Sequence, residues 1–371
     1  MPKERIAFAN TLRGIAALCV VIVHYTGVFW TSRDAAANLI HAPELPPAFV
    51  FPVYLQWLHL TVPQFSWGAF GVSLFFLISG FVIPFSLRNV TWQGFLVGRF
   101  FRIVPLYMAG FTITLLSIWL VGRYFDVAWP FSFSEAAVHY LPGLREFFGM
   151  PSIDGIVWTL EIEIKFYLIC ALVIVLFRRK SAWVFVVPAV LAIAEFWMAG
   201  RAFGPAVLLP APFLIFMFIG VTFHYLHEGA LKAEQALFLA AALFLVFAIL
   251  LGRTMPELAP MAWTYGFAVV VFTFAASFPQ LFRSTRVGDF FADISYPLYV
   301  VHGVAGYVAL RVLLDLGMRA WVSLIITTAG ALLISWLLHV LVEIPSHNYG
   351  KRLARRLQEP KAPDIIGAVA E

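Results

Sequence analysis

The sequence predicts an all-α integral membrane protein with about ten transmembrane helices and both termini in the cytoplasm. The first observation is composition: 62% of the 371 residues are hydrophobic, only 12% are charged, and the mean hydropathy is +0.89. Soluble domains contain about 45–50% apolar and about 25% charged residues. The second observation is that the apolar residues form runs close to the roughly 20 residues that cross a bilayer. The third is that basic residues gather at alternate ends of these runs.

Ten apolar runs define one membrane domain over residues 1–345, followed by a short basic cytoplasmic tail over residues 346–371. Cys19 and Cys170 both lie in apolar runs, so no disulfide framework is expected. No small-residue cleavage site follows the first run, so no cleavable signal peptide is expected. The predicted spans cover residues 8–30, 67–87, 101–122, 157–177, 182–199, 205–226, 234–252, 261–281, 291–313 and 321–342.

The orientation in the membrane follows from the basic residues. Seventeen of the lysines and arginines fall at one set of helix ends, seven fall at the other, and Lys165 falls inside a predicted span. The richer set marks the cytoplasmic side, which places the two longest loops, about 31–66 and 123–156, outside the cytoplasm. Loops of this length are more often functional than plain connections. Because topology accounts for the basic excess, no nucleic-acid partner is predicted.

The first span carries Arg13 at its start and His24 eleven positions later, with no charge between them. At about 1.5 Å per helical residue, the two residues lie roughly 16 Å apart along the axis. If Arg13 marks the headgroup level, His24 lies near the middle of the bilayer, where ionisable side chains mark functional sites. The alternative is a histidine that only bonds to a neighbouring helix.

The fourth span begins with Trp158 and places Glu161, Glu163 and Lys165 within its first turns. Glu161 and Lys165 are four residues apart and are expected to pair on one helix face. Glu163 lies on another face and has no local partner, so it must find a histidine, a cation or water, or stay protonated. The alternative is a buried carboxylate–histidine pair that fixes helix packing.

Arg99 and Arg102 share a helix face at the cytoplasmic start of the third span. Guanidinium groups bind phosphates bidentately, and simple setting of topology is the alternative. Ser79-Gly80, in the middle of the second span, favours close helix packing.

Polar residues also run into the ninth span and close the tenth. Ser295, Tyr296 and His302 enter the ninth span, where Pro297 permits a kink. At the end of the tenth span, His339 lies one turn before Glu343 and is expected to pair with it. The sequence contains no metal-ligand spacing, no phosphate-binding glycine loop and no nucleophile elbow, so no metal site is predicted.

These motifs, in this order, resemble those of the acyltransferase 3 family of membrane acyltransferases over nearly the whole chain. The chain departs from the family at Asn10, often acidic there, at Thr159, usually serine, and at Ile164 and Lys165, often glutamate and glutamine. The matching pieces are Arg13 with His24; Ser79-Gly80-Phe81; Arg99 and Arg102 with Pro105 and Tyr107; Trp158-Thr159-Leu160 with Glu163, Phe166 and Tyr167; Ser295-Tyr296-Pro297-Leu298-Tyr299 with His302; and Glu343 with Pro345.

The resemblance implies a stand-alone enzyme of the bacterial inner membrane, in contact with membrane lipids. It would move an acyl group, usually acetyl, from cytoplasmic acyl-CoA as co-substrate to a hydroxyl of a cell-surface glycan or lipid-linked sugar, without a permanently bound cofactor. Arg13, Arg99 and Arg102 would hold the phosphates of acetyl-CoA. His24 would act as general base or as an acyl-accepting nucleophile, oriented by Glu163. The other site-lining residues would be Ser79, Trp158, Tyr167, Ser295, Tyr296 and His302.

Two other functions compete with this interpretation. Buried histidine and glutamate also build proton relays, so a proton-coupled transporter of a small solute or saccharide is one alternative, although no internal repeat supports it. The other is a membrane acyltransferase of a different superfamily that acylates lipids or proteins. The sequence leaves open the acceptor, the length of the acyl group, the choice between general-base and acyl-histidine chemistry, and the oligomeric state.

Overall fold

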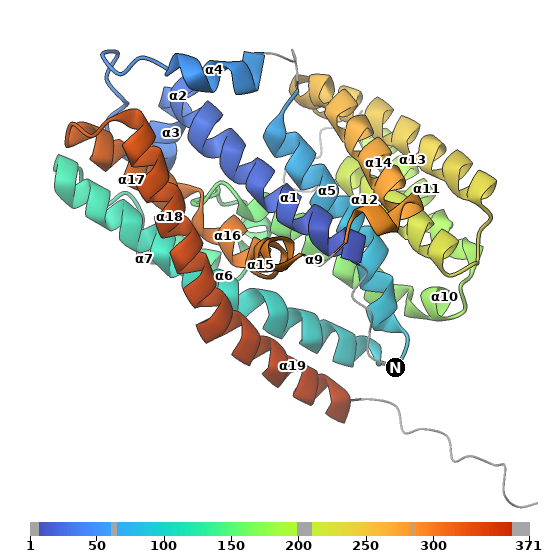
Figure 1. Ribbon diagram of the computed structural model, residues 1–371. Coiled ribbons are helices and arrows are strands. Elements are labelled where there is room, and N and C mark those ends of the chain that lie inside the picture. Colours follow the sequence, from blue (N-terminus) through green and yellow to red (C-terminus); the bar gives the residue numbers. More distant parts are fainter. Residues whose placement is uncertain (1–6, 61–64, 199–209, 284, 358–371) are drawn as a thin grey trace, which may run out of the picture.

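The computed structural model describes residues 7–60, 65–198, 210–283 and 285–357, and every regular element in these ranges is helical (Figure 1). The predicted all-α class is therefore confirmed. The basic residues predicted at positions 3, 5, 201 and 361 lie outside the described residues.

The centre of the molecule is built on two close helix contacts. Helix α1 (Ala7–Val23) packs along α5 (Trp67–Val82) (Figure 1). A Cβ atom at Gly71 would lie 2.6 Å from the carbonyl oxygen of Ala16, so glycine is what lets the two backbones meet. Farther along α5, a Cβ atom at Gly80 would lie 2.0 Å from the carbonyl oxygen of Met217 on α12 (Ala211–His227). The packing predicted from Ser79-Gly80 is confirmed.

Helix α12 is enclosed by the rest of the protein. Every residue from Ala211 to Tyr225 is buried, which is typical of a core helix that is apolar on all sides. The remaining helices of this part of the chain are η2 (Ile83–Leu87), α6 (Trp92–Phe125), α9 (Val157–Leu172), α10 (Ile174–Arg178), η3 (Ala182–Phe185), α11 (Val186–Met198), α13 (Ala233–Thr254), η5 (Pro256–Met261), α14 (Ala262–Ser277) and η6 (Pro279–Leu281).

The C-terminal part contains a broken helix and a long one. Helices α15 (Arg286–Asp293), α16 (Ser295–Val301) and α17 (Val304–Asp315) follow one another, and α16 and α17 meet at 57°. The sequence placed the kink at Pro297, but the bend comes after His302, because Pro297 lies in the first turn of α16, where no helical N–H partner is needed. Helix α18 (Ala320–Leu338) continues through the π-helical turn η7 (His339–Glu343) into α19 (Ile344–Arg356), along one side of the molecule (Figure 1).

The number of spans agrees with the prediction only in part. Within the described ranges, six helices are long and apolar enough to cross a membrane, and seven if the bent α16–α17 pair counts as one span. The described parts of the segments predicted at 157–177, 182–199 and 205–226 form shorter helices, and the first of these is interrupted at Val173. Residues 199 and 205–209 of these segments lie outside the described residues. The chain is thus a multi-pass helical protein, and the count of ten stays a prediction.

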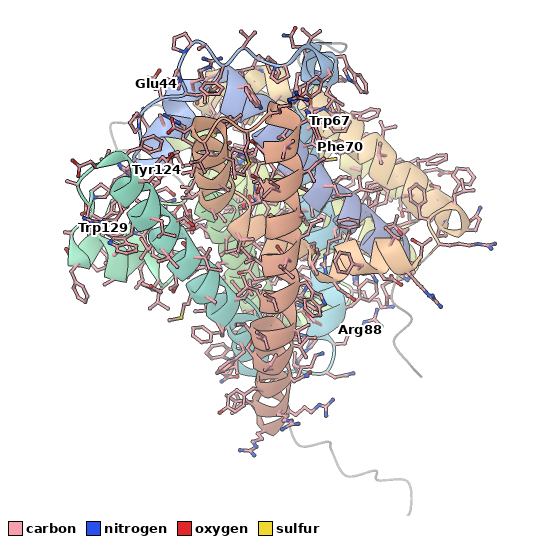
Figure 2. All side chains as sticks on the ribbon, turned by 60° about the vertical axis from the view of Figure 1, so that its left-hand side comes forward. Glu44, Trp67, Phe70, Arg88, Tyr124 and Trp129 are labelled. Atoms are coloured by element: carbon pink, nitrogen blue, oxygen red, sulfur yellow. The ribbon has the colours of Figure 1, made fainter. Side chains whose placement is uncertain are left out.

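Loops predicted for the same membrane side lie together. Arg88 and Lys180 both pair with Glu228, which joins three helix connections at one end. At the other end, Arg311 donates to the carbonyl oxygen of Pro43 at 3.1 Å. In Figure 2, Glu44 and Trp67 lie near one end of the molecule and Arg88 lies nearer the opposite one. The grouping agrees with the predicted topology, while the cytoplasmic assignment of the richer end stays a prediction.

The two long loops contain helices of their own. The loop over 31–66 forms α3 (Arg33–Ile40) and α4 (Val53–Leu60), and α4 lies across one end of the bundle (Figure 1). The loop over 123–156 forms α7 (Phe133–His139) and α8 (Leu144–Phe147).

Candidate functional site

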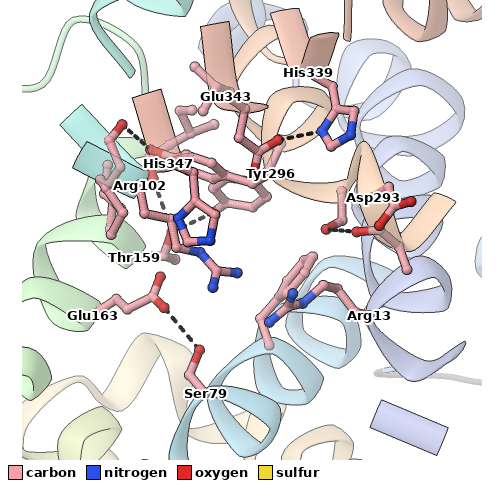
Figure 3. A pocket seen from close by; sticks show the side chains of 18 of the residues that line it. Arg13, Ser79, Arg102, Thr159, Glu163, Asp293, Tyr296, His339, Glu343 and His347 are labelled. Carbon is pink, nitrogen blue, oxygen red and sulfur yellow. Dashed lines mark hydrogen bonds and ion pairs between the residues drawn. The ribbon is translucent and has the colours of Figure 1, made fainter. Parts of the chain in front are cut away.

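A cavity of about 520 Å³ opens between α1, α5, α6, α9, α15, α16 and the α18–α19 helix (Figure 3). Apolar side chains such as Phe75, Phe76 and Val72 form part of its wall. Its polar lining residues are Asn10, Arg13, Ser79, Arg102, Thr159, Glu163, Tyr167, Asp293, Ser295, Tyr296, Tyr299, His339, Glu343, His347, Asn348 and Lys351.

Two arginines of the lining have no hydrogen-bond or ion-pair partner in the described part of the chain. Arg13 and Arg102 come from α1 and α6, and both are partly buried. Among the described residues, neither guanidinium makes a hydrogen bond or an ion pair. The carboxylates of Glu163 and Glu343 act on the charge of Arg13 without bonding to its guanidinium. A guanidinium that keeps its five N–H donors unused in a planar fork can bind an anionic ligand.

The predicted pair of Arg99 and Arg102 separates. Arg102 lines the cavity, but Arg99 is absent from its lining and donates to Ser86 Oγ at 2.6 Å. The Arg99 guanidinium also lies over the rings of Phe95 and Tyr167, 5.3 and 5.2 Å from their centroids. Three residues turn a helix by 300°, so the two side chains point 60° apart, and that offset is enough to turn Arg99 toward η2 and α9. Arg99 thus supports the cavity wall through Tyr167.

Glu163 faces the cavity and is bonded on both sides. It accepts a hydrogen bond from Ser79 Oγ at 3.0 Å and another from Tyr167 Oη at 2.5 Å (Figure 3). The prediction that Glu163 lacks a local partner is wrong, because Tyr167 lies one helical turn farther on the same face of α9. Glu163, Ser79 and Tyr167 therefore form one connected group in the wall.

The pairing predicted between Glu161 and Lys165 is also wrong. Glu161, which is 1% exposed, pairs with Arg145 on α8, and Lys165 Nζ lies 2.5 Å from Glu146 Oε2 on the same short helix. The reason is that the loop over 123–156 folds back onto α9 and offers each charge an opposite one. These two ion pairs tie the loop to the start of α9.

Loss of the buried ion pair should destabilise the protein. Arg145→Met leaves Glu161 buried without its cation, and removing one partner of a buried ion pair costs about 3–5 kcal/mol. Lys165→Met is the matched control, because its pair with Glu146 is partly exposed, at 24% and 34%, and exposed pairs contribute about 0–1 kcal/mol. We expect Arg145→Met to lower the melting temperature of the purified protein clearly more than Lys165→Met. Equal shifts would contradict a buried ion pair at Glu161.

His24 lies outside the cavity lining and makes different contacts from those predicted. Its Nδ1 is 2.5 Å from Tyr307 Oη, and its ring centroid is 4.9 Å from that of His302, in an edge-on arrangement. His24 is the first residue of the π-helical turn η1 (His24–Val28), which leads into α2 (Phe29–Thr31). Single π-helical turns inside helices are frequent at functional sites.

His302 is fully buried beside His24. Its Nδ1 lies 3.0 Å from the carbonyl oxygen of Leu298 and 2.8 Å from that of Tyr299. Both neighbours can only accept, so Nδ1 carries the proton. Its Nε2 is buried and has no hydrogen-bond partner among the described residues. A buried lone pair without a donor is unusual, and such groups call for a functional reason.

Two hydrogen-bonded residues, Thr159 and Tyr299, lie on the side of the cavity that is nearest to the histidines. Tyr299 Oη lies 2.6 Å from Thr159 Oγ1, and both residues line the cavity. The Tyr299 ring is 5.7 Å from the His302 ring, so Tyr299 contacts the cavity and the histidine pair.

The predicted contact of His24 with Glu163 is not formed. Thr159 links α9 to the histidine side through Tyr299, and Glu163 comes four residues, about 6 Å, later along the helix. Each predicted partner binds another residue instead: His24 contacts Tyr307, and Glu163 contacts Ser79 and Tyr167.

The other predicted residues divide between the cavity and its surroundings. Ser295 and Tyr296 line the cavity, and Tyr296 Oη donates to the carbonyl oxygen of Ile103 at 3.0 Å. Trp158 is not part of the lining and packs on Phe213, with ring centroids 5.5 Å apart. The expected pairing of His339 with Glu343 is confirmed at 2.7 Å.

Some residues of this region have no role predicted from the sequence, among them Tyr307, His347, Asn348 and Lys351. Tyr307 carries no sequence signal, because its contact with His24 joins residues 283 positions apart. His347, Asn348 and Lys351 fall in the predicted tail. A signal for two of them existed: residues 339, 343, 347 and 351 are polar and recur every four positions, which places them on one helix face.

The chain matches a known protein family over most of its length. The model of the acyltransferase 3 family, described as an acyltransferase domain, matches residues 6–340. The chain is 30% identical to Nodulation protein 10 of Rhizobium leguminosarum bv. viciae over 166 residues, which cover 39% of this chain and 45% of that protein. It thus spans less than half the length of that relative.

A second relative is matched over a longer stretch. The chain is 26% identical to the exopolysaccharide production protein ExoZ of Rhizobium meliloti (strain 1021) over 307 residues, which cover 79% of this chain and 93% of that protein. No solved structure gives a significant match. Because the family model covers nearly the whole described bundle, the chain belongs to the acyltransferase 3 family of membrane acyltransferases.

Proposed function

We propose that this protein transfers an acyl group, acetyl in the first instance, from cytoplasmic acyl-CoA to a hydroxyl of a cell-surface glycan or a lipid-linked saccharide. One observation carries the donor assignment. Arg13 and Arg102 face a cavity of about 520 Å³, and among the described residues neither guanidinium has a hydrogen-bond or ion-pair partner. The phosphates of coenzyme A match two such groups in charge and in geometry.

The acceptor class draws on a relative. The exopolysaccharide production protein matches over most of both chains, which supports a saccharide as acceptor here. A proton-coupled transporter is the second candidate. It is favoured by the buried contact between His24 and His302, because His302 Nε2 has no hydrogen-bond partner among the described residues.

The proposed reaction uses His24 as general base. With Nδ1 held by Tyr307, Nε2 is the nitrogen of His24 left for chemistry. The acceptor hydroxyl gives its proton to Nε2, its oxygen bonds to the thioester carbon, the C–S bond breaks, and the coenzyme leaves as thiolate that takes up the proton. Because Tyr299 and Thr159 close the cavity on the side of the histidines, their hydrogen bond must open for the thioester to reach His24.

The function is tested with purified protein in lipid nanodiscs. Acetyl-CoA and longer acyl-CoA donors are supplied with and without bacterial exopolysaccharide fragments, and both released thiol and acylated saccharide are measured. The proposal expects protein-dependent thiol release that increases with acceptor. Proton-coupled uptake of solute into proteoliposomes without any thiol release would favour the transporter instead.

Tyr307 is proposed as the residue that positions His24, the role that the family resemblance implies for Glu163. Tyr307→Phe removes the Oη contact and is expected to lower kcat about tenfold or more with little change in KM. Tyr25→Phe is the matched control, since Tyr25 Oη donates to the carbonyl oxygen of His302 at 2.9 Å and leaves His24 Nδ1 untouched. Equal losses of kcat in both variants would show a purely structural contribution from Tyr307.

A further inference from the structure

Helix α19 is part of the cavity although the sequence predicts a tail from residue 346. Four polar residues on one face of η7 and α19, spaced four positions apart, line the cavity: His339, Glu343, His347 and Lys351. From His339 to Lys351 the helix rises about 18 Å. The first two residues bond to each other at 2.7 Å, so the face leads from a bonded pair to His347 and Lys351.

His347 lies in a basic environment with part of its hydrogen-bonding capacity unused. Its Nδ1 is buried and has no hydrogen-bond partner among the described residues. Lys351, Arg102 and Arg99 are near enough to act on its charge, and all three are cationic. Cations gathered around one imidazole repel one another and attract ions of the opposite sign. The carboxylates of the cavity, Glu163, Asp293 and Glu343, are not among the charges that act on His347. In Figure 3 His347 and Arg102 lie next to each other on one side of the cavity.

Packing fixes α19 against the helix that carries Arg102. A Cβ atom at Gly350 would lie 2.5 Å from Cβ of Phe101, so α19 and α6 meet closely there. The rings of Phe101 and Tyr349 are 5.1 Å apart. At the end of α19, Thr91 Oγ1 donates to the carbonyl oxygen of Leu357 at 2.6 Å. His347 is therefore held at a defined place relative to Arg102.

We propose that His347, with Lys351 at the rim, binds a phosphate group at the nucleotide end of the acyl donor. This inference rests on the proposed function, in which the donor is acyl-CoA. Arg13 and Arg102 then hold phosphate deeper in the cavity, the nucleotide lies toward α19, and the acyl end points toward Tyr299. An imidazole donates one N–H to a phosphate oxygen when neutral and two when protonated, so His347 binds in either form.

The experiment measures binding of adenosine 3′,5′-bisphosphate, adenosine and coenzyme A to purified full-length protein by calorimetry. We expect His347→Ala to weaken binding of the bisphosphate and of coenzyme A about tenfold or more, and Lys351→Ala to weaken both to a smaller extent. Adenosine, which has no phosphate, should bind equally to all variants. His347→Gln, which keeps an N–H donor, should recover part of the affinity.

Arg352→Ala is the matched control, because Arg352 is an exposed cation on the same helix and is not part of the cavity lining. It should bind all three ligands like the wild type. If the wild type binds the bisphosphate and His347→Ala binds it equally well, the phosphate subsite on α19 is overturned while the acyltransferase proposal stands. If the wild type binds the bisphosphate through His347 but releases no thiol from any acyl-CoA, the subsite stands and the acyltransferase proposal fails. If the wild type binds neither the bisphosphate nor coenzyme A, the phosphate subsite and the acyltransferase proposal are both overturned.

Discussion

His24→Ala is expected to lower acyl transfer by about 10²–10⁴-fold, the usual contribution of a general base. The variant removes the imidazole whose Nδ1 is bonded to Tyr307 and whose Nε2 is available for the acceptor hydroxyl. Binding of acyl-CoA should be nearly unchanged, because His24 does not line the cavity in which the donor is proposed to bind. The measurement is initial rate against donor and acceptor concentration, with binding of a non-hydrolysable acyl-CoA analogue measured separately.

His41→Ala serves as the control for a histidine change, because His41 lies at the end of α3 and its ring packs on Phe131, 4.9 Å between centroids. It should keep the wild-type rate. Full acyl transfer by a correctly folded His24→Ala protein would exclude both general-base and acyl-histidine chemistry at this residue. Detection of an acylated His24 after rapid quenching with donor alone would separate the two, since only the nucleophilic route forms that adduct.

Arg13→Ala and Arg102→Ala are each expected to weaken binding of coenzyme A by about tenfold to a hundredfold, the range for hydrogen bonds to charged groups. The reason is that both guanidinium groups face the cavity without a protein partner among the described residues. Removing either guanidinium group therefore removes contacts to the ligand and breaks no ion pair among the described residues. The affinity of the wild type should also fall as salt is added, because exposed parts of the site are screened.

Arg99→Ala provides a sharp comparison, because Arg99 stands three residues from Arg102 on the same helix. Its bond to Ser86 and its stacking on Tyr167 predict a loss of thermal stability with a smaller loss of coenzyme A affinity. Equal effects of Arg99→Ala and Arg102→Ala on affinity would mean that the paired phosphate site expected from the sequence forms when ligand is bound. Unchanged affinity in both Arg13→Ala and Arg102→Ala would reject the cavity as the donor site.

Much of the architecture was accessible from the sequence because it depends on composition and on short spacings. The apolar fraction predicts a helical membrane protein, the ordered motifs predict the acyltransferase 3 family, and both are confirmed. Local rules also worked where both partners lie on one helix, as for His339 and Glu343. The small residue Gly80 marks a close helix contact, and the structure has one there.

Partners that come from other helices were beyond the reach of these rules. Spacing on α9 alone suggests that Glu161 pairs with Lys165, yet the tertiary fold brings α8 alongside and gives Glu161 to Arg145. A buried charge needs an opposite charge that offsets the cost of losing its water, wherever that partner lies in the chain. The same holds for His24, whose neighbours His302 and Tyr307 lie more than 270 residues away.

The sequence by itself thus determined the fold class and the family, and it singled out some of the polar residues that line the cavity, among them Arg13, Arg102 and Glu163. Only the tertiary structure decided how those residues are connected: Arg102 in the cavity with Arg99 behind its wall, Glu163 with Ser79, and His24 beyond Tyr299. It also decided that α19 belongs to the site, because a polar face at four-residue spacing gains meaning only from the helix against which it packs. Periodicity defines the faces of each helix, whereas the packing of helices defines which faces meet.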